Sequence, residues 1–293
     1  MIFACIDIGS NTIRLLVAEG SEDGLREVAS QRAFTRIGKS LSRVGALPVE
    51  KVAETADVVA EQARTAREAG ADHVAAVATA AIRDATNRDE LAADVERRSG
   101  LPLRVLTSEE EARLSFVGAT RTLATPVEGK IAVTDVGGGS TEIAIGDPDG
   151  TVSWSSSLRV GSGVLADSHF RSDPPSPAEL EAARRHIATI LEGLDPPPAA
   201  TALAVGGSAT SLRRFVGTEL YEATLQPAIR LLSVTPIAEV ANTFGLDAER
   251  VRLLPGGILV LAALSERLGR PLTIARGGLR EGVVLELLDG RGS

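Results

Sequence analysis

Two pairs of apolar strands along the chain follow the same pattern. In residues 5–17 an apolar strand ends in Asp7, a glycine follows two residues later, and a second apolar strand begins at a hydroxyl side chain. Residues 132–145 repeat this order around Asp135. Because the two copies lie a domain's length apart, the pattern predicts duplication of a whole domain. For either copy alone, an ordinary hairpin turn is the alternative.

The charges that follow the two aspartates are opposite. Side chains alternate between the faces of a strand, and seven residues after the aspartate the return strand carries Arg14 in the first copy and Glu142 in the second. The glycines suit either a turn with positive φ or a close approach of backbone N–H groups to phosphate oxygens. We therefore expect two related half-sites that face each other across a cleft, one for anionic phosphate and the other for metal or water.

The remaining pattern alternates between strands and helices, which is typical of an α/β fold. In the first half it predicts, from the spacing of apolar residues, strand 26–38, helix 48–70, strand 73–78, helix 80–98, strand 103–106 and helix 108–123. In the second half it predicts strand 152–158, helix 177–194, strand 202–205 with a helix after it, and helices 256–268 and 279–288. The break at Thr125-Pro126 predicts two domains, 1–125 and 126–293.

Composition narrows the class of protein. A chain of 293 residues exceeds the usual single core, in agreement with two domains. The net charge of −8 and the 3% aromatic content argue against nucleic-acid binding. Cys5 is the only cysteine, which excludes an internal disulfide and fits a reducing compartment. With no signal peptide and no apolar run of membrane-spanning length, we expect a soluble cytoplasmic protein.

The available side chains also limit the metal. The histidines, His73, His169 and His186, are scattered without ligand spacing, so neither a zinc site nor a histidine-based triad has support. Carboxylate oxygens remain as candidate ligands, and they favour magnesium.

Five segments in this order and spacing resemble the motifs of the exopolyphosphatase and guanosine pentaphosphate phosphohydrolase (Ppx/GppA) family: 7–12, 79–87, 110–113, 135–142 and 277–282. The resemblance covers essentially the whole chain. It implies a duplicated actin-like (ribonuclease H-like) fold with a cleft between two domains. It also implies magnesium-dependent cleavage of terminal phosphoryl groups, with manganese as an alternative metal, and a homodimer.

The same resemblance implies roles for two residues of the first half. Glu111 would be the catalytic base that activates water. Its alternative is structural, because Ser108 and Glu111 have the spacing of a capping box at the start of a helix. Arg83 would contact phosphate, and an exposed helical arginine is the alternative there.

Metal and phosphate ligands are implied for the repeated turns. Asp135 and Glu142 would bind the metal, with Asp7 facing the same cleft; the alternatives are an edge-strand charge for Glu142 and a turn residue for Asp7. The implied phosphate ligands are Gly9, Ser10, Asn11, Thr12 and Arg14 in the first copy, and Gly137, Gly138, Gly139, Ser140 and Thr141 in the second. The turn 206–208, with Gly207 and Ser208, could bind an anion at a helix N-terminus or be merely structural. Arg280 and Glu281 could form an internal pair instead of a site.

The expected reaction is hydrolysis of a terminal phosphoanhydride. Inorganic polyphosphate is the first candidate substrate, and guanosine pentaphosphate is the second because no aromatic-rich pocket for a base is evident. Val164 stands where many relatives carry a basic residue, which puts the binding of long chains in doubt. An actin-like kinase and a noncatalytic sensor of polyphosphate or alarmone are the alternatives from other classes. The presence of Glu111, Asp135 and Glu142 together counts against the sensor.

Overall fold

The chain folds into two compact units. A computed structural model describes residues 1–21 and 24–290, with residues 42–44 by their backbone alone. The first unit contains Met1–Thr125 and the chain from Gly277 onward, and the second contains Pro126–Arg276. The predicted second domain, 126–293, therefore differs from the structure at its end, because the last helix packs into the first unit.

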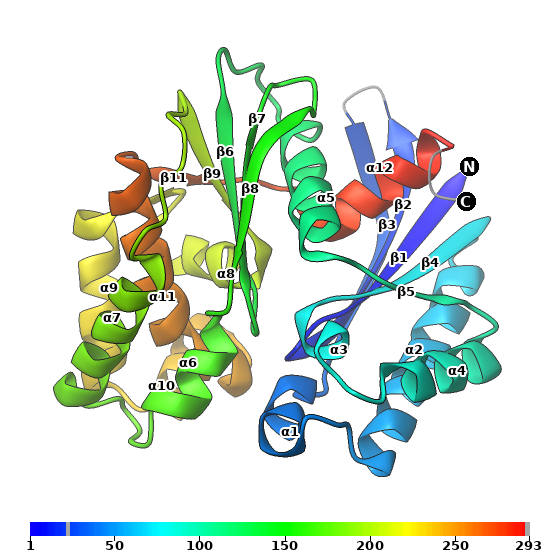
Figure 1. The fold of residues 1–293 in the computed structure, drawn as a ribbon, viewed down its shortest axis with the longest axis horizontal. Coiled ribbons are helices and arrows are strands. Elements are labelled where there is room, and N and C mark those ends of the chain that lie inside the picture. Colours follow the sequence, from blue (N-terminus) through cyan, green and yellow to red (C-terminus); the bar gives the residue numbers. More distant parts are fainter. Residues whose placement is uncertain (22–23, 291–293) are drawn as a thin grey trace. The chain divides into compact units, whose positions relative to one another are not determined.

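The first unit is built on a five-stranded sheet of order β3-β2-β1-β4-β5 (Figure 1). β1 and β2 and then β2 and β3 are antiparallel, whereas β1, β4 and β5 are parallel. The strands are β1 (Ile2–Ile8), β2 (Thr12–Ser21), β3 (Gly24–Phe34), β4 (His73–Ala78) and β5 (Leu103–Val105). The helices are α1 (Ile37–Val44), α2 (Val49–Glu68), α3 (Ala80–Arg83), α4 (Arg88–Ser99), α5 (Ser108–Thr120) and α12 (Leu279–Leu288).

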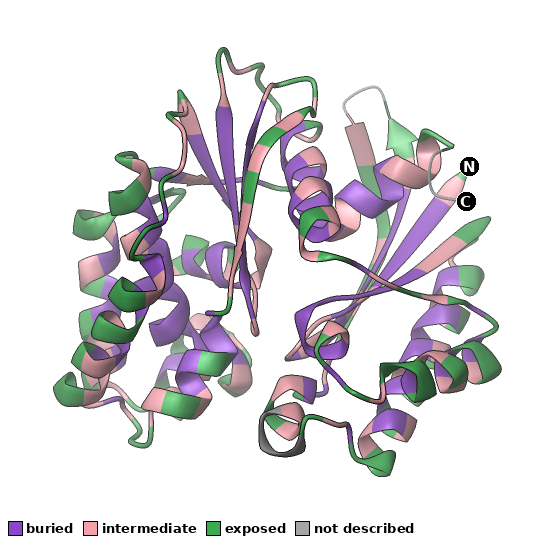
Figure 2. Cartoon of the chain, viewed as in Figure 1, coloured by how far each residue is buried: buried purple, intermediate pink, exposed green. Residues whose placement is uncertain are grey.

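Helices cover both faces of this sheet. On one face Ile6, Ile8 and Leu15 pack with Val59 of α2 and Val95 of α4. On the other face, β-strand residues pack with Leu114 of α5 and with Leu279, Val283 and Val284 of α12. The central strand β1 is accordingly buried over most of its length and β4 over its second half (Figure 2). Helix α12 thus supplies part of the second cluster.

The second unit repeats the plan. Its six-stranded sheet has the order β10-β11-β9-β6-β7-β8, in which β6 pairs antiparallel with β7 and parallel with β9, as β1 does with β2 and β4. The strands are β6 (Ile131–Val136), β7 (Thr141–Gly146), β8 (Val152–Leu158), β9 (Thr201–Val205), β10 (Glu219–Leu220) and β11 (Leu272–Ile274). The helices are α6 (Ser162–His169), α7 (Pro177–Leu191), α8 (Gly206–Val216), α9 (Glu222–Val234), α10 (Ile237–Phe244) and α11 (Ala248–Leu268). The predicted α/β class and duplication are confirmed.

Some predicted boundaries are wrong. The predicted strand 26–38 ends at Phe34, and helix α1 begins at Ile37 after Arg36, whose φ of 51° is left-handed. The predicted helix 80–98 is two helices, α3 and α4. Helix α11 begins at Ala248 and runs through Pro255, which the sequence interpretation placed before its start. Buried Leu254 before this proline and buried Ile258 after it hold the turn helical despite the missing N–H of the proline.

Helices α5 and α12 cross with their backbones in contact. A Cβ on Gly118 would lie 1.9 Å from the carbonyl oxygen of Gly278, and a Cβ on Gly282 would lie 2.0 Å from that of Leu114. No side chain fits at either position, so glycine is required by the close approach rather than by its own φ. This crossing fixes how far the two helices can slide along each other.

Candidate active site

The two repeated turns have the same geometry. In the first unit the N–H of Gly9 donates to the carbonyl of Thr12 at 3.0 Å, and in the second the N–H of Gly137 donates to Ser140 at 3.0 Å. A Cβ on Gly9 would lie 3.2 Å from Thr12 O, and one on Gly137 would lie 3.1 Å from Ser140 O. Neither glycine has positive φ. Positive φ is therefore not the reason for either glycine; a carbonyl of the same turn lies close to each one, and the approach of these turns to phosphate stays a prediction.

In the first unit, the strand register aligns three charged residues in one row. Asp7 of β1 lies opposite Arg14 of β2, and Arg14 lies opposite Arg32 of β3. Opposed residues point to the same face of a sheet. The Arg32 guanidinium also lies over the Phe34 ring, 5.0 Å from its centroid. Arg32 was not predicted from the sequence, because a lone arginine in a strand carries no signal until the register is known.

The equivalent row in the second unit is acidic. Asp135 of β6 lies opposite Glu142 of β7, and Glu142 lies opposite Ser157 of β8. Glu142 is only 2% exposed, which excludes a solvated edge-strand charge. The Ser157 hydroxyl donates to Glu142 Oε1 at 3.0 Å. Ser157 is thus a further candidate site residue that spacing along the sequence could not reveal.

This carboxylate pair suits a hard divalent cation. Like charges directly opposed across two strands repel each other, and a bound cation removes that cost. Among the residues that the structure describes, no group of three or more histidine, cysteine, aspartate or glutamate side chains could hold a metal ion. Asp135 and Glu142 would therefore be completed by water and substrate oxygens, as is usual for magnesium. Asp7 lies opposite Arg14 in the first unit, so the protein itself places a cation beside it.

Each turn is braced by the helix that follows the third strand. In the first unit the N–H of Gly38, in α1, donates to the Ser10 carbonyl at 2.7 Å. In the second, the N–H groups of Ser162 and Gly163 donate to the carbonyls of Gly137 and Gly138, each at 2.9 Å. The helix N-termini thus bind the carbonyl groups of both turns. The sequence interpretation missed this role of Ser162 and Gly163 and considered only the neighbouring Val164, for the binding of long chains.

Asn11 has a buried donor in the first turn. Its side chain is 9% exposed, and its Nδ2 has no hydrogen-bond partner among the described residues. The Asn11 carbonyl accepts from the N–H groups of Thr35 and Arg36, both at 3.1 Å. A buried amide without an acceptor costs about 1–3 kcal/mol, and an anion at this turn would remove that cost.

Glu111 lies in the first turn of α5 and is only 7% exposed. Its Oε2 accepts a hydrogen bond of 2.9 Å from Nη1 of Arg83, and the same nitrogen donates to the Leu106 carbonyl at 2.8 Å. Arg83 ends α3, directly after β4, and its side chain is 19% exposed, so it is no freely exposed helical arginine. The structure therefore joins the two first-half residues that the family resemblance singled out.

The capping box of α5 does not use Glu111. The N-cap is Thr107, and its partner is Glu110: the Glu110 N–H donates to Thr107 Oγ1 at 3.1 Å, and the Thr107 N–H donates to Glu110 Oε2 at 2.9 Å. The structural alternative for Glu111 was a capping box between Ser108 and Glu111. This alternative is wrong, because the observed box lies one residue earlier, between Thr107 and Glu110. Glu111 is left buried in an ion pair for which helix capping gives no reason.

The turn before α8 lies beside Asp135. Gly206 has a φ of +81°, and a Cβ there would lie 2.3 Å from Asp135 Oδ1. A Cβ on Gly207 would lie 2.7 Å from Nη1 of Arg250, an arginine only 6% exposed that sequence reasoning missed. A Cβ on Gly257 of α11 would lie 2.9 Å from the Cβ of buried Ser208, so Ser208 packs against that helix.

Several other candidate residues have internal partners. The Thr141 hydroxyl donates to the Val160 carbonyl at 2.6 Å. Arg280 donates to the Leu15 carbonyl at 3.3 Å, and Glu281 accepts from the Gly278 N–H at 2.9 Å as the cap of α12. Arg280 and Glu281 also form an ion pair of 3.8 Å, so the internal pair expected as an alternative is observed. Burial raises the pKa of the Cys5 thiol well above its usual value, with Asp7 adding to the effect, so this cysteine stays protonated.

Two sheets of one plan, each carrying the same turn between its first two strands, define a duplicated α/β fold. The sequence model of the Ppx/GppA phosphatase family matches residues 16–290. The chain belongs to this family.

Relatives carry two different names. The chain is 29% identical over 300 residues to "Guanosine-5'-triphosphate,3'-diphosphate pyrophosphatase" of Aeromonas hydrophila, covering 98% of this chain and 59% of that protein. It is also 29% identical over 315 residues to "Exopolyphosphatase 1" of Mycobacterium tuberculosis, covering 99% and 89%. The chain thus spans little more than half the length of the first relative and most of the second.

Solved structures share the whole fold. A family member from Aquifex aeolicus superposes with a TM-score of 0.82 at 29% identity, covering 100% of this chain and 99% of that one. An exopolyphosphatase from Cytophaga hutchinsonii superposes with a TM-score of 0.85 over the full length of both chains; at 20% identity this shows the fold alone. None of the helices in residues 1–21 and 24–290 has the length and apolar character needed to span a membrane.

Proposed function

We propose that the chain hydrolyses the terminal phosphoanhydride of inorganic polyphosphate and releases orthophosphate. The observation that carries this proposal is the buried ion pair between Glu111 and Arg83. A general base must be held in one orientation, and this ion pair holds the Glu111 carboxylate, which takes no part in capping the helix. Phosphoryl transfer otherwise needs mainly positioning and charge stabilisation.

In the proposed reaction, Glu111 takes a proton from water as the water oxygen attacks the terminal phosphorus. The bond between that phosphorus and the bridging oxygen breaks, and the shortened chain leaves with the bridging oxygen. The proposed phosphate ligands are Asn11 Nδ2, the guanidinium groups of Arg83 and Arg14, and the N–H groups of the two turns. The N–H groups of Gly9 and Gly137 are left out because they donate to carbonyls of their own turns. The bracing of the turn carbonyls by α1 and α6 supports this assignment, because it turns the N–H groups toward an anion.

A magnesium ion is proposed on Asp135 and Glu142, with manganese as a substitute. When bound, it would neutralise charge on the phosphate oxygens. Ser157 would orient Glu142, and Gly206 leaves the space that Asp135 Oδ1 occupies. Asp7 remains a prediction as a further ligand, as do a homodimer and a cytoplasmic location.

Guanosine pentaphosphate is the second candidate substrate, since one set of relatives bears the name of that pyrophosphatase. Polyphosphate is preferred because only 3% of the residues are aromatic, which leaves few side chains on which a guanine base could stack. An actin-like kinase would need a phosphoryl acceptor, and a sensor would need no Glu111.

The test is orthophosphate release with magnesium, measured side by side from tripolyphosphate, long-chain polyphosphate, guanosine pentaphosphate and ATP. We expect the highest kcat/KM with a polyphosphate. Faster release from guanosine pentaphosphate would favour the second candidate. Consumption of ATP only when an acceptor is added would favour a kinase, and binding without release from any of the four would favour a sensor.

A further inference from the structure

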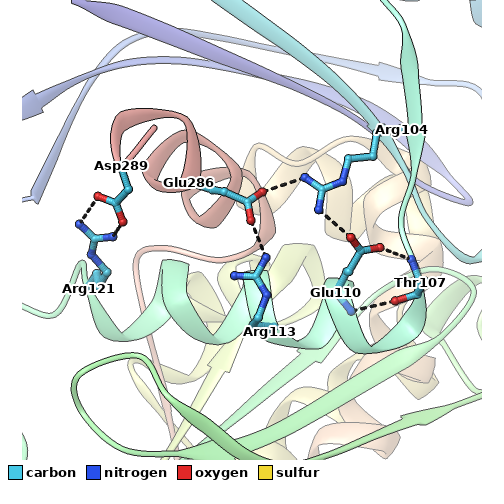
Figure 3. A network of polar contacts seen from close by, with 7 residues as sticks. All are labelled: Arg104, Thr107, Glu110, Arg113, Arg121, Glu286 and Asp289. Carbon is cyan, nitrogen blue, oxygen red and sulfur yellow. Dashed lines mark hydrogen bonds and ion pairs between the residues drawn. The ribbon is translucent and has the colours of Figure 1, made fainter. Parts of the chain in front are cut away.

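The last helix of the chain is connected to the first turn of α5 by a series of ion pairs (Figure 3). Glu286 of α12 accepts from Arg104 Nη1 at 2.8 Å and from Arg113 Nη2 at 2.5 Å. Arg104, in β5, also donates to Glu110 Oε1 at 2.7 Å. These four residues, Arg104, Glu110, Arg113 and Glu286, are called the α5–α12 network below.

The network ends at the residue before Glu111. Glu110 is bound by Arg104 through Oε1 and by the Thr107 N–H through Oε2, so the cap of α5 and its contact with α12 share one carboxylate. The Glu111 N–H donates to the Thr107 carbonyl at 3.0 Å. Any rotation of this first turn would therefore move the Glu111 carboxylate and break contacts that reach to Glu286.

A second set of contacts holds Glu111 from the opposite direction. Arg83 binds both Glu111 and the Leu106 carbonyl, which lies directly before the N-cap. The glycine crossing at Gly118 and Gly282 prevents α5 from sliding along α12. Arg83 thus fixes the Glu111 side chain, Arg104 fixes the capping residue Glu110, and the glycine crossing fixes the position of α5.

The charges of the network persist at neutral pH. Burial would raise the pKa of Glu286, but its hydrogen bonds with Arg104 and Arg113 outweigh this and lower it. The hydrogen bond with Arg104 lowers the pKa of Glu110, and the Thr107 backbone adds to the effect. The Glu286 side chain is only 11% exposed, so its two ion pairs are less screened than surface pairs.

We propose that Glu286 is a positioning residue for Glu111, acting through Arg104 and Glu110 on the first turn of α5. This rests on the proposed function of Glu111 as the base. The substrate does not contact Glu286 in this proposal; the effect is on the orientation of the base. The helix that closes the first unit would therefore set the rate of the chemical step.

The chain offers a matched control. Arg121, after the C-terminal end of α5, forms a two-bond ion pair with Asp289 of α12, at 2.6 and 3.2 Å (Figure 3). This pair joins the same two helices at the end remote from Glu111. Asp289→Asn removes an ion pair between the two helices that is not connected to the N-cap of α5. Glu286→Gln removes ion pairs that are connected to this N-cap through Arg104 and Glu110.

The experiment compares the full-length wild type with Glu286→Gln and Asp289→Asn. Steady-state phosphate release gives kcat and KM, and hydrogen exchange measures protection of the amides of residues 108–112. For Glu286→Gln we expect kcat to fall about 10- to 100-fold at unchanged KM, the range for a catalytic group displaced by about an ångström. We also expect faster exchange in that turn. Asp289→Asn should match the wild type in both, and Glu286→Asp should restore part of the kcat.

The outcomes separate the two proposals. If the wild type releases no phosphate from any of the four substrates, the proposed function fails, and the exchange data alone decide whether Glu286 orders the first turn of α5. If the wild type is active and Glu286→Gln equals Asp289→Asn in kcat and in exchange, the positioning role is refuted. If both variants lose the same thermal stability but only Glu286→Gln has a lower kcat, the positioning role is supported.

Discussion

Glu111 and Arg83 lie 28 residues apart and share a hydrogen bond of 2.9 Å, with both side chains largely removed from solvent. Arg83 comes from the helix after β4 and Glu111 from the helix after β5, two neighbouring parallel strands. The carboxyl ends of parallel strands are the usual place for a ligand site in an α/β sheet. The pair is therefore where this fold class most often carries its chemistry.

Replacing the proposed base should abolish turnover without unfolding the protein. For Glu111→Gln we expect kcat to fall by about 10²- to 10⁴-fold, the usual contribution of a positioned general base. Glu109→Gln, an exposed glutamate in the same turn, is the control and should keep wild-type kcat. Phosphate release and circular dichroism measure the two effects. Near-normal release by Glu111→Gln would remove it from the mechanism.

The hydroxyl that supports Glu142 should tune metal affinity. Ser157→Ala leaves Glu142 without the 3.0 Å hydrogen bond, and loss of such a supporting contact typically costs about 10- to 100-fold in metal affinity. Ser155→Ala, two residues earlier on β8 and exposed, is the control. We expect a higher magnesium concentration for half-maximal release with Ser157→Ala alone. Identical magnesium titrations for both variants would contradict a metal on Glu142.

Alanine substitutions at Gly206 and Gly193 distinguish the effect of backbone strain from the effect of displacing Asp135. Both have a φ of +81°, so alanine at either position costs about 1–2 kcal/mol in the left-handed region. At Gly206 the new methyl group would meet Asp135, at 2.3 Å from Oδ1; at Gly193 no atom of the described residues would lie within 4 Å of it. We expect Gly206→Ala and Gly193→Ala to have similar melting temperatures. Only Gly206→Ala should lose phosphate release. Full activity of a folded Gly206→Ala variant would show that Asp135 can move without consequence.

Arg32 should affect the binding of long chains more than short ones. It lies opposite Arg14, and like charges so placed are stabilised by a polyanion along the row. For Arg32→Gln we expect the KM for long-chain polyphosphate to rise about 2- to 5-fold, as for an exposed charge contact worth up to about 1 kcal/mol. The KM for tripolyphosphate should change less. Arg26→Gln on the same strand, where Arg26 pairs with Glu19, is the control; an equal effect of both variants would mean general charge loss.

Acid should weaken the docking of α12. The pKa values of Glu286 and Glu110 are lowered in the folded protein, so their contribution to stability is complete above the unfolded value of about 4.3 and is lost as the pH falls through the lower folded values. The charged groups that face them are Arg104 and Arg113. The difference in melting temperature between wild type and Glu286→Gln should therefore be largest near pH 7 and shrink below about pH 4. A constant difference across this range would show that the ion pairs do not contribute.

Local patterns predicted the fold where each element is decided by its own residues. Strand β4 and helix α12 have the predicted bounds: β4 is a short apolar run between Asp72 and Thr79, and α12 follows the glycines Gly277 and Gly278. The predicted strand 26–38 was wrong at its end because α1 begins after a left-handed arginine, for which no residue type is diagnostic. The paired turns were visible because the motif is contiguous.

Contacts made across strands could not be predicted in this way. Arg32 and Ser157 join the site only through register, and the capping glutamate was misplaced by one residue because Thr107 and Ser108 are both good caps. The position of α12 in the first unit depends on backbone packing at Gly118 and Gly282. A sequence shows those glycines but not the helix that each one faces.

The return of α12 has a consequence for biosynthesis. The ribosome completes all of Pro126–Arg276 before it makes the helix that supplies Leu279, Val283 and Val284 to the first sheet. N-terminal domains often fold while the rest of the chain is still being translated. Here the earlier-made half must keep an apolar sheet face without this covering helix until α12 has been made, so a nascent chain, or one terminated before α12, would expose that face to chaperones and proteases.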